Sequence, residues 1–142
     1  MKKTSYLLSI LLLASVPGLA ACTYVTDVAY FEDKTWGLVE YGEPGSMTAV
    51  LENAAVTVRF NSDDNRVAGT AGCNHYFAGY RHSGGLVSLE EQMAVTEMWC
   101  GEEIGEQEKR YLEILQAVQS YEIDGLTLRL SGKEGGLVYT LE

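Results

Sequence analysis

Two cysteines and two histidines are the residues of this sequence best suited to bind a metal ion or to react with a substrate. Their order along the chain is Cys73, His75, His82 and Cys100. Zinc ligands usually come as pairs two to four residues apart, and here only the first pair approaches that spacing. A redox dithiol favours the C-x-x-C motif, which the sequence lacks. We therefore expect no metal site at these residues.

Two groups of acidic and amide side chains could hold a cation. Asn61, Asp63 and Asn65 alternate as in a calcium loop, but an EF-hand needs glycine at position six and glutamate at position twelve. Arg66 and Gly72 stand there instead, so we expect a turn. The second group lies at the expected start of a helix and consists of Glu102, Glu103, Glu106 and Glu108. Because the helix dipole favours negative charge at that end, we expect these side chains to be solvated rather than to act as acids or bases.

Motifs of hydrolysis and nucleotide binding are absent from the sequence. It contains no G-x-S-x-G, no P-loop and no H-E-x-x-H, and neither histidine has a serine or cysteine partner in a known arrangement. We therefore expect a protein that is not an enzyme and that needs no cofactor.

The N-terminus has the features of a bacterial secretory signal. Lys2 and Lys3 precede a mostly apolar run, and small residues precede Cys22 in the stretch "LAAC". This stretch resembles a lipobox, which predicts a lipoprotein signal peptide over residues 1–21 and lipidation of Cys22. Ordinary cleavage after Ala20 and an uncleaved anchor are the alternatives. A spanning helix wants about 20 apolar residues, and this run ends in Pro17 and Gly18.

The mature chain would be strongly acidic. Removing residues 1–21 takes away two of ten Lys and Arg, so eight remain against 20 Asp and Glu, a net charge of −12. That charge disfavours nucleic acid and anionic head groups as partners. We expect membrane contact through the lipid on Cys22. Thr23 follows it where an aspartate would favour retention in the inner membrane, so we expect the outer membrane, on its periplasmic face.

The remaining two cysteines, Cys73 and Cys100, then lie in an oxidising compartment. Two thiols in one small extracytoplasmic domain are most simply explained by a disulfide. Closing a loop of about 27 residues is worth roughly 3.5 kcal/mol on the chain-entropy model.

Period-two patterns and turn residues predict mostly strands and one helix. We expect a tether over residues 22–34, part of which packs on the domain. The expected strands cover residues 35–41, 54–60, 67–74, 86–89 and 137–142, with a hairpin turning at Asp124 and Gly125 and a helix over residues 102–121. Small residues on both faces of 67–74 predict a close backbone approach or a bend that Asn74 ends at positive φ. Beyond it we expect Phe77 and Tyr80 to fill the core.

In this order, "TWGLVEY", "RVAGTAGCNHYFAGY", "MAVTEMWC" and "YEIDGLTLRL" resemble the META domain of HslJ-like bacterial lipoproteins. The resemblance runs over most of residues 35–142. It implies an α+β fold: a curved antiparallel sheet, or incomplete barrel, with one helix packed against it. The core motif of the family falls on Gly72, Cys73, Asn74, Tyr76 and Phe77, and its second cysteine on Cys100.

The resemblance and the signal peptide together indicate a non-catalytic, lipid-anchored envelope protein. We expect it to be stress-related, or to bind or steady other envelope components. The alternative is a binding module, either an inhibitor of a foreign enzyme such as a lysozyme or a binder of a small apolar ligand.

Overall fold

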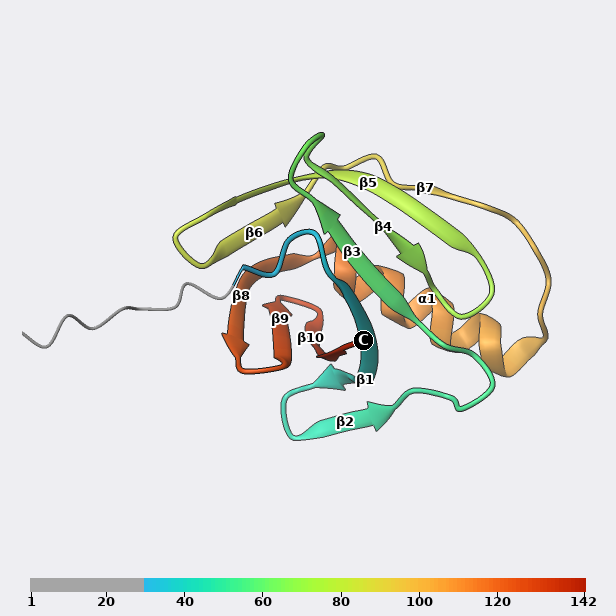
Figure 1. Ribbon diagram of the computed structural model, residues 1–142. Helices are drawn as coiled ribbons and strands as arrows, with labels where there is room; N and C mark the ends of the chain where they lie inside the picture. The colour runs from blue at the N-terminus through green and yellow to red at the C-terminus, as the bar shows by residue number, and fades with distance from the viewer. Residues whose placement is uncertain (1–29) are drawn as a thin grey trace, which may run out of the picture.

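The computed structural model describes residues 30–142, which form a β-barrel with one helix (Figure 1). Cys22 and the expected signal peptide lie outside this range. The elements are β1 (Thr35–Glu43), β2 (Ser46–Ala49), β3 (Thr57–Asn61), β4 (Arg66–Thr70), β5 (His75–Ser83), β6 (Leu86–Leu89), β7 (Ala94–Val95), α1 (Glu102–Gln116), β8 (Val118–Asp124), β9 (Thr127–Gly132) and β10 (Gly135–Leu141). Within residues 30–142 no helix has the length and hydrophobicity that crossing a membrane requires.

The sheet closes on itself, which corrects the expectation of an incomplete barrel. Eight antiparallel strands follow one another in the order β1, β3, β4, β5, β6, β8, β9, β10, and β10 pairs again with β1 from Trp36↔Leu141 to Gly42↔Gly136. Strands β2 and β7 are additions, paired with β1 and β5. Closure removes the two unpaired edges of an open sheet. The α+β class is confirmed. The pairing of the first strand with the last could not be predicted, because no local sequence pattern indicates it.

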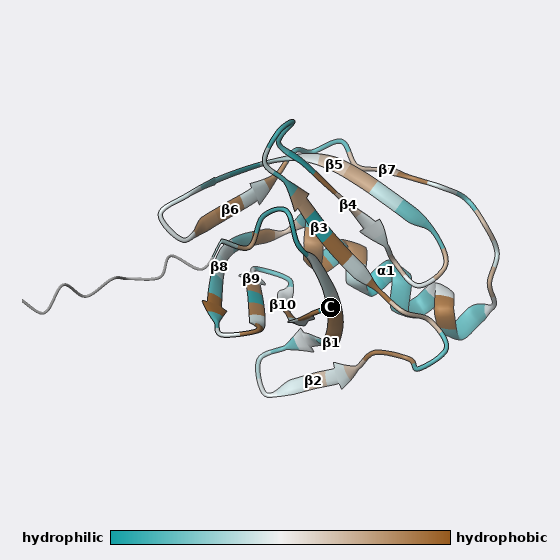
Figure 2. Ribbon diagram, in the orientation of Figure 1, coloured by the Kyte–Doolittle hydropathy of each residue, from teal (hydrophilic) through white to brown (hydrophobic). Residues whose placement is uncertain are grey.

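The inside of the barrel is filled by apolar side chains, which in several strands alternate with polar ones. In β3, for example, Val58 and Phe60 are buried while Arg59 is exposed, and Figure 2 shows the alternation as bands of colour. Twenty-one buried hydrophobic residues come from the strands, the helix and the loops between them. Burial of such side chains is the main source of stability in a domain of this size.

Helix α1 covers one end of this core. Its buried residues Gln107, Tyr111, Ile114 and Leu115 pack towards strands β1, β6 and β10. The helix is shorter than expected, because it ends at Gln116 and Val118 begins strand β8. Pairing with β9 explains the difference: Val118 lies opposite Gly132, and Tyr121 opposite Leu130. The expected hairpin is confirmed, with Gly125 and Leu126 rather than Asp124 and Gly125 between its strands.

Three tyrosine hydroxyls form a buried chain beneath the helix. Tyr139 donates to Tyr111 at 3.1 Å, the hydroxyls of Tyr111 and Tyr76 lie 2.7 Å apart, and Tyr76 donates to the Thr57 carbonyl at 2.9 Å. Every member therefore has a partner inside the barrel. Burial raises the pKa of all three hydroxyls well above the ordinary value.

Phe31 covers the opposite end of the core. Its ring lies edge-on to Phe60 with centroids 4.8 Å apart, and its carbonyl accepts a 2.8 Å hydrogen bond from the indole of Trp36. Part of the segment expected to be a tether therefore packs on the domain.

The stretch before β5 differs from its expected strand. Strand β4 ends at Thr70, and residues 71–74 form a turn in which Gly72, not Asn74, has positive φ, at 105°. The expected close approach occurs at Gly69, where a Cβ atom would overlap the Thr57 carbonyl oxygen. The expectation that Phe77 fills the core is wrong, because it lies three residues from buried Tyr80, and the period of two therefore turns it outward.

Candidate interaction site

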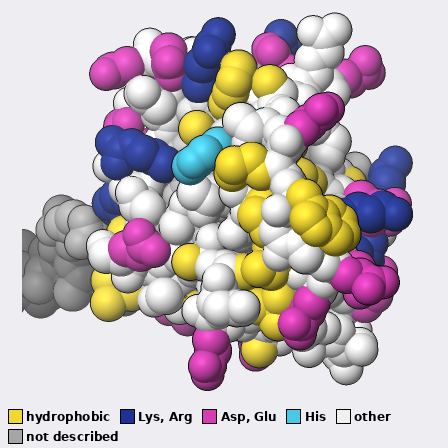
Figure 3. All heavy atoms as spheres, turned by 90° about the vertical axis from the view of Figure 1, so that its right-hand side faces the viewer, with side chains coloured by type: hydrophobic (Ala, Val, Ile, Leu, Met, Phe, Trp, Pro, Cys, Tyr) yellow, Lys and Arg dark blue, Asp and Glu magenta, His cyan; other side chains and the backbone are white. Residues whose placement is uncertain are grey.

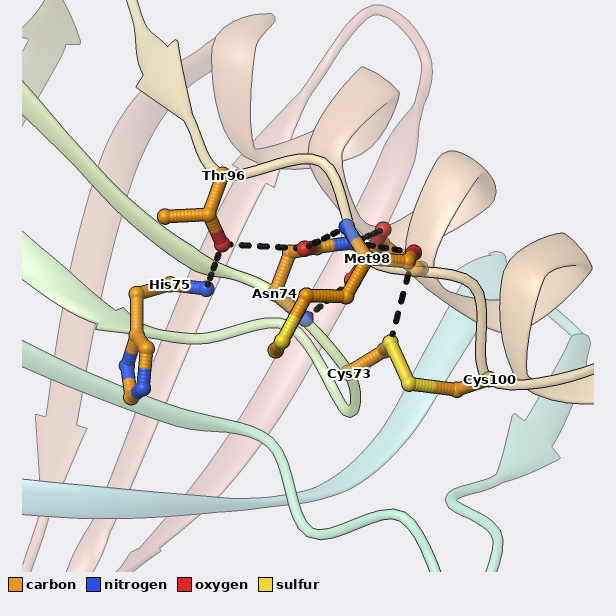
Figure 4. The surroundings of a disulfide bond; sticks show 7 residues. Cys73, Asn74, His75, Thr96, Met98 and Cys100 are labelled. Atoms are coloured by element: carbon orange, nitrogen blue, oxygen red, sulfur yellow. Dashed lines mark hydrogen bonds between the residues drawn. A yellow bond between two sulfur atoms is a disulfide. The ribbon is translucent and has the colours of Figure 1, made fainter.

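The disulfide expected from the sequence joins Cys73 in the turn before β5 to Cys100 just before α1 (Figure 4). Their Cα atoms lie 5.9 Å apart, within the range that disulfides use. The bond fixes one end of residues 96–100, which we call the disulfide loop. The same turn and the same loop also contain the rest of the candidate site.

The side chain of Asn74 holds the disulfide loop through hydrogen bonds. Its side-chain Oδ1 accepts hydrogen bonds from the Thr96 hydroxyl at 2.9 Å and from the Met98 N–H at 2.7 Å. Its Nδ2 donates to the Met98 carbonyl at 3.2 Å and to Glu108 at 2.7 Å. The side chain is buried and uses both its donor and its acceptor capacity, so Asn74 holds the loop in one conformation.

Glu108 is a structural partner that sequence reasoning missed. Its carboxylate accepts the Asn74 N–H and the Asn74 amide, each at 2.7 Å. The expectation that all four helix-start glutamates are solvated is therefore wrong for this one. Its neighbour Gln107 is buried and accepts the Leu51 N–H at 2.7 Å. Glu108 lies three residues before buried Tyr111 on the helix, but this spacing gave only a weak signal because its partner Asn74 is 34 residues away in the sequence.

The disulfide loop exposes two large apolar side chains. Trp99 is 83% exposed and Met98 is 55% exposed. Val95 of β7 comes directly before the loop, and Phe77 on the neighbouring strand β5 is 49% exposed. Strand β7 pairs with β5 at this point, opposing Ala94 to Phe77. Figure 3 shows hydrophobic side chains in a band down the middle of this face.

Acidic residues surround the disulfide loop in sequence. No lysine or arginine occurs between Arg81 and Lys109. Seven glutamates occur in the same segment: Glu90, Glu91, Glu97, Glu102, Glu103, Glu106 and Glu108. The Arg66 guanidinium lies 5.5 Å from the Phe77 ring centroid. In Figure 3 the Lys and Arg side chains lie towards the sides and the top of the face.

The two histidines are far apart. His75 is exposed at the start of β5, whereas Nε2 of His82 lies 3.2 Å from the Glu32 carboxylate near the end of that strand. Seven residues of strand separate them by roughly 23 Å. Because Cys73 and Cys100 are also bonded to each other, the four residues with partial metal-ligand character do not form one site. Among the described residues no three His, Cys, Asp or Glu side chains are placed to share a metal ion.

A polar hollow of about 640 Å³ lies beside β5, and Arg66 and Phe77 are among the residues that line it. Its lining residues are Asp64, Asn65, Arg66, Phe77, Ala78, Gly79, Tyr80, Arg81, His82, Glu90 and Gln92. Burial, and then the hydrogen bond to Glu32, raise the pKa of Tyr80, so its hydroxyl stays protonated as a donor. The hollow contains a histidine but no serine, threonine or cysteine for it to activate as a nucleophile.

Solved structures share this architecture. An NMR structure of a protein from Burkholderia xenovorans superposes with a TM-score of 0.66 at 21% identity, covering 79% of this chain and 83% of that one. A second NMR structure gives a TM-score of 0.59 at 18% identity, covering 78% and 91%. At such identities the likeness shows the fold alone. None of the curated proteins compared with the chain matches it significantly.

Together, the closed antiparallel barrel, the helix across its end and the disulfide-linked turn define a class of small α+β domains built on a closed barrel. The family comparison then makes this specific, since the META domain model matches residues 29–142. The chain belongs to the META domain family, as the sequence motifs indicated.

Proposed function

We propose that this chain is a non-catalytic protein, anchored by lipid on Cys22 to the periplasmic face of the outer membrane, whose META domain binds another envelope component. The observation that carries the proposal is the disulfide loop, which exposes Trp99 on a backbone fixed by a covalent bond and by Asn74. A rigid loop with an exposed tryptophan is suited to binding and contributes nothing to the packing of the core.

The most perturbed titratable groups support binding over catalysis. The hydroxyls of Tyr76, Tyr111 and Tyr139 have raised pKa values because they are fully buried, and they bond to one another or to the backbone. A catalytic group must reach its substrate, and these groups do not reach the surface.

The filled barrel does not favour a small apolar ligand inside it. Phe31 packs across one end, and Tyr111 lies fully buried under the helix at the other. A ligand in the barrel would have to displace these side chains from a close-packed core.

Inhibition of a foreign enzyme involves the same kind of protein contact as the proposed binding. The identity of the partner therefore decides between these two functions.

Lipid attachment is tested by feeding cells a fatty acid with a clickable tag. We expect the wild-type protein to carry the label and to be recovered in the outer-membrane fraction. Cys22→Ser should carry no label and should not be recovered there. Label on Cys22→Ser, or an unlabelled wild type in the soluble fraction, would contradict the anchor.

Partner binding is tested in the same strains with a membrane-permeable amine crosslinker. Lys109 and Lys133 are among the exposed lysines of the domain that can react. We expect a discrete crosslinked species from the wild type that Cys22→Ser, released from the membrane, reduces. Its absence from both strains would contradict the proposed function.

A further inference from the structure

We propose that the disulfide loop, with Val95 directly before it and Phe77 on the neighbouring strand β5, is the surface by which the domain binds a protein partner that carries basic groups around an apolar pocket. The inference rests on the proposed function and specifies its partner. Three features of the described residues carry it: a preformed loop, the charge around it, and its position relative to the start of the domain.

The loop is preformed because it is attached to the barrel along its length. The Thr96 N–H donates to the His75 carbonyl at 3.0 Å, the Met98 N–H donates to Asn74, and Cys100 is bonded to Cys73. Binding through such a loop requires little further ordering of the chain. Tryptophan is also among the residues that contribute most to protein interfaces when a partner covers them.

The charge around the loop selects the partner. Glu97 lies within the loop, and Glu102 and Glu103 follow it on the first turn of α1, all three exposed. No lysine or arginine lies within the surrounding segment of 27 residues from His82 to Glu108, although Arg66 covers part of the Phe77 ring. A partner with basic groups at the rim of its pocket complements this surface, whereas anionic lipid head groups are repelled by it.

The position of the loop favours a protein over the membrane. Asn74, which holds the loop, immediately precedes β5, while Phe31 packs against Tyr80 and His82 further along that strand. Six residues of strand between Asn74 and Tyr80 span about 20 Å. Figure 1 accordingly shows the segment between β7 and α1 on the side of the barrel opposite the entry of the chain. A domain tethered through its N-terminus presents this loop away from its own anchor.

The test is site-specific photocrosslinking of the full, lipidated chain in its own cells. A benzophenone amino acid replaces Trp99 in one strain and Leu126 in another. Leu126 is a matched control because it is 65% exposed and lies on the β8–β9 turn, away from the loop. We expect a discrete protein adduct at position 99, at least ten-fold stronger than at position 126, and mass spectrometry to identify a basic protein.

Charge is tested with two triple variants that change the net charge equally. Glu97→Gln/Glu102→Gln/Glu103→Gln should lower the adduct yield at position 99 at least three-fold. Glu52→Gln/Glu122→Gln/Asp124→Asn, which neutralises exposed side chains elsewhere, should leave the yield unchanged.

Each other outcome overturns the proposal. Equal adducts at both positions, or adducts only at 126, would show that the domain binds a partner through another surface, so the proposed function would survive. An adduct to lipid, or to an acidic protein with no effect of the triple variant at the loop, would refute the partner chemistry. No adduct at 99 while the amine crosslinker captures a partner would refute this surface alone, and failure of both reagents would also refute the proposed function.

Discussion

At the residue scale, Asn74 has a role that its amino-acid type alone does not reveal. Its four side-chain hydrogen bonds link the turn after β4, the disulfide loop and helix α1 through Glu108. A buried amide leaves several donors and acceptors unpaired when it is removed, and each costs about 1–3 kcal/mol. Asn74 therefore connects three segments of the chain that are remote in sequence.

Asn74→Ala should lower the free energy of unfolding by about 2–4 kcal/mol, because the Met98 N–H loses its acceptor and the Glu108 carboxylate loses one of its two donors. Asn74→Asp should lower the free energy of unfolding at least as much at neutral pH, despite its similar shape. It removes both N–H donors and places a second carboxylate next to that of Glu108. Urea unfolding measures both. Asn53→Ala, at an exposed asparagine, is the control and should stay within about 0.5 kcal/mol of wild type. A wild-type stability for Asn74→Asp would contradict the assigned hydrogen bonds.

Gly72 is required by backbone conformation. Its φ of 105° is one that L side chains rarely adopt, and a Cβ atom there would lie 3.2 Å from Nε2 of buried Gln107. Gly72→Ala should cost about 1–2 kcal/mol, measured by thermal unfolding. The matched change Gly105→Ala, in open space on the helix, should stabilise by about 0.5–1 kcal/mol. Equal changes in stability for the two alanine variants would refute the requirement for glycine at position 72.

At the element scale, the disulfide ties a strand turn to the start of a helix across 27 residues. Cys73→Ser and Cys100→Ser should each lower the free energy of unfolding by about 2–4 kcal/mol, and by amounts equal within about 0.5 kcal/mol, because each breaks the same bond. Denaturant unfolding with and without a reductant measures this. Clearly unequal losses, or a wild type unaffected by reduction, would contradict a stabilising crosslink.

Local patterns predicted the elements that depend on local chemistry. Alternation located β3, the turn before Leu86 located β6, and the turn at Gly125 located the β8–β9 hairpin. Features that depend on partners remote in the chain could not be predicted from local sequence patterns. They are the pairing of β1 with β10, the strand conformation of Val118 opposite Gly132, and the link from Asn74 to Glu108. The outward side chain of Phe77 could have been predicted from its odd spacing to Tyr80. That spacing also marks the apolar patch of the candidate site.

At the scale of the whole molecule, the barrel is closed by pairing and filled from both ends. Phe31 packs at one end, and at the other the tyrosine chain lies beneath α1. This arrangement fills the interior with packed side chains. The buried hydroxyls give the whole fold a sensitivity to alkaline pH.

Stability should fall as the pH rises above about 10. The pKa values of Tyr76, Tyr111 and Tyr139 are raised in the folded state, so the unfolded chain releases their protons first and is favoured. These three protons correspond to a slope of up to about 4 kcal/mol per pH unit, and Tyr80, whose pKa is also raised, adds to that slope. Urea unfolding at pH 8–11.5 measures it. Tyr139→Phe, which removes the hydroxyl that donates at the start of the chain, should reduce the slope by about one proton; an unchanged slope would contradict its burial as a neutral phenol.

The most direct test of the account is the equilibrium affinity between the purified full-length protein in detergent and the partner identified by photocrosslinking. Trp99→Ala is compared with wild type and with Leu126→Ala at two salt concentrations. The account predicts that Trp99→Ala weakens binding at least about ten-fold, that Leu126→Ala does not, and that added salt weakens the wild-type complex. Equal affinities for wild type and Trp99→Ala would contradict the claim that the disulfide loop is the binding surface.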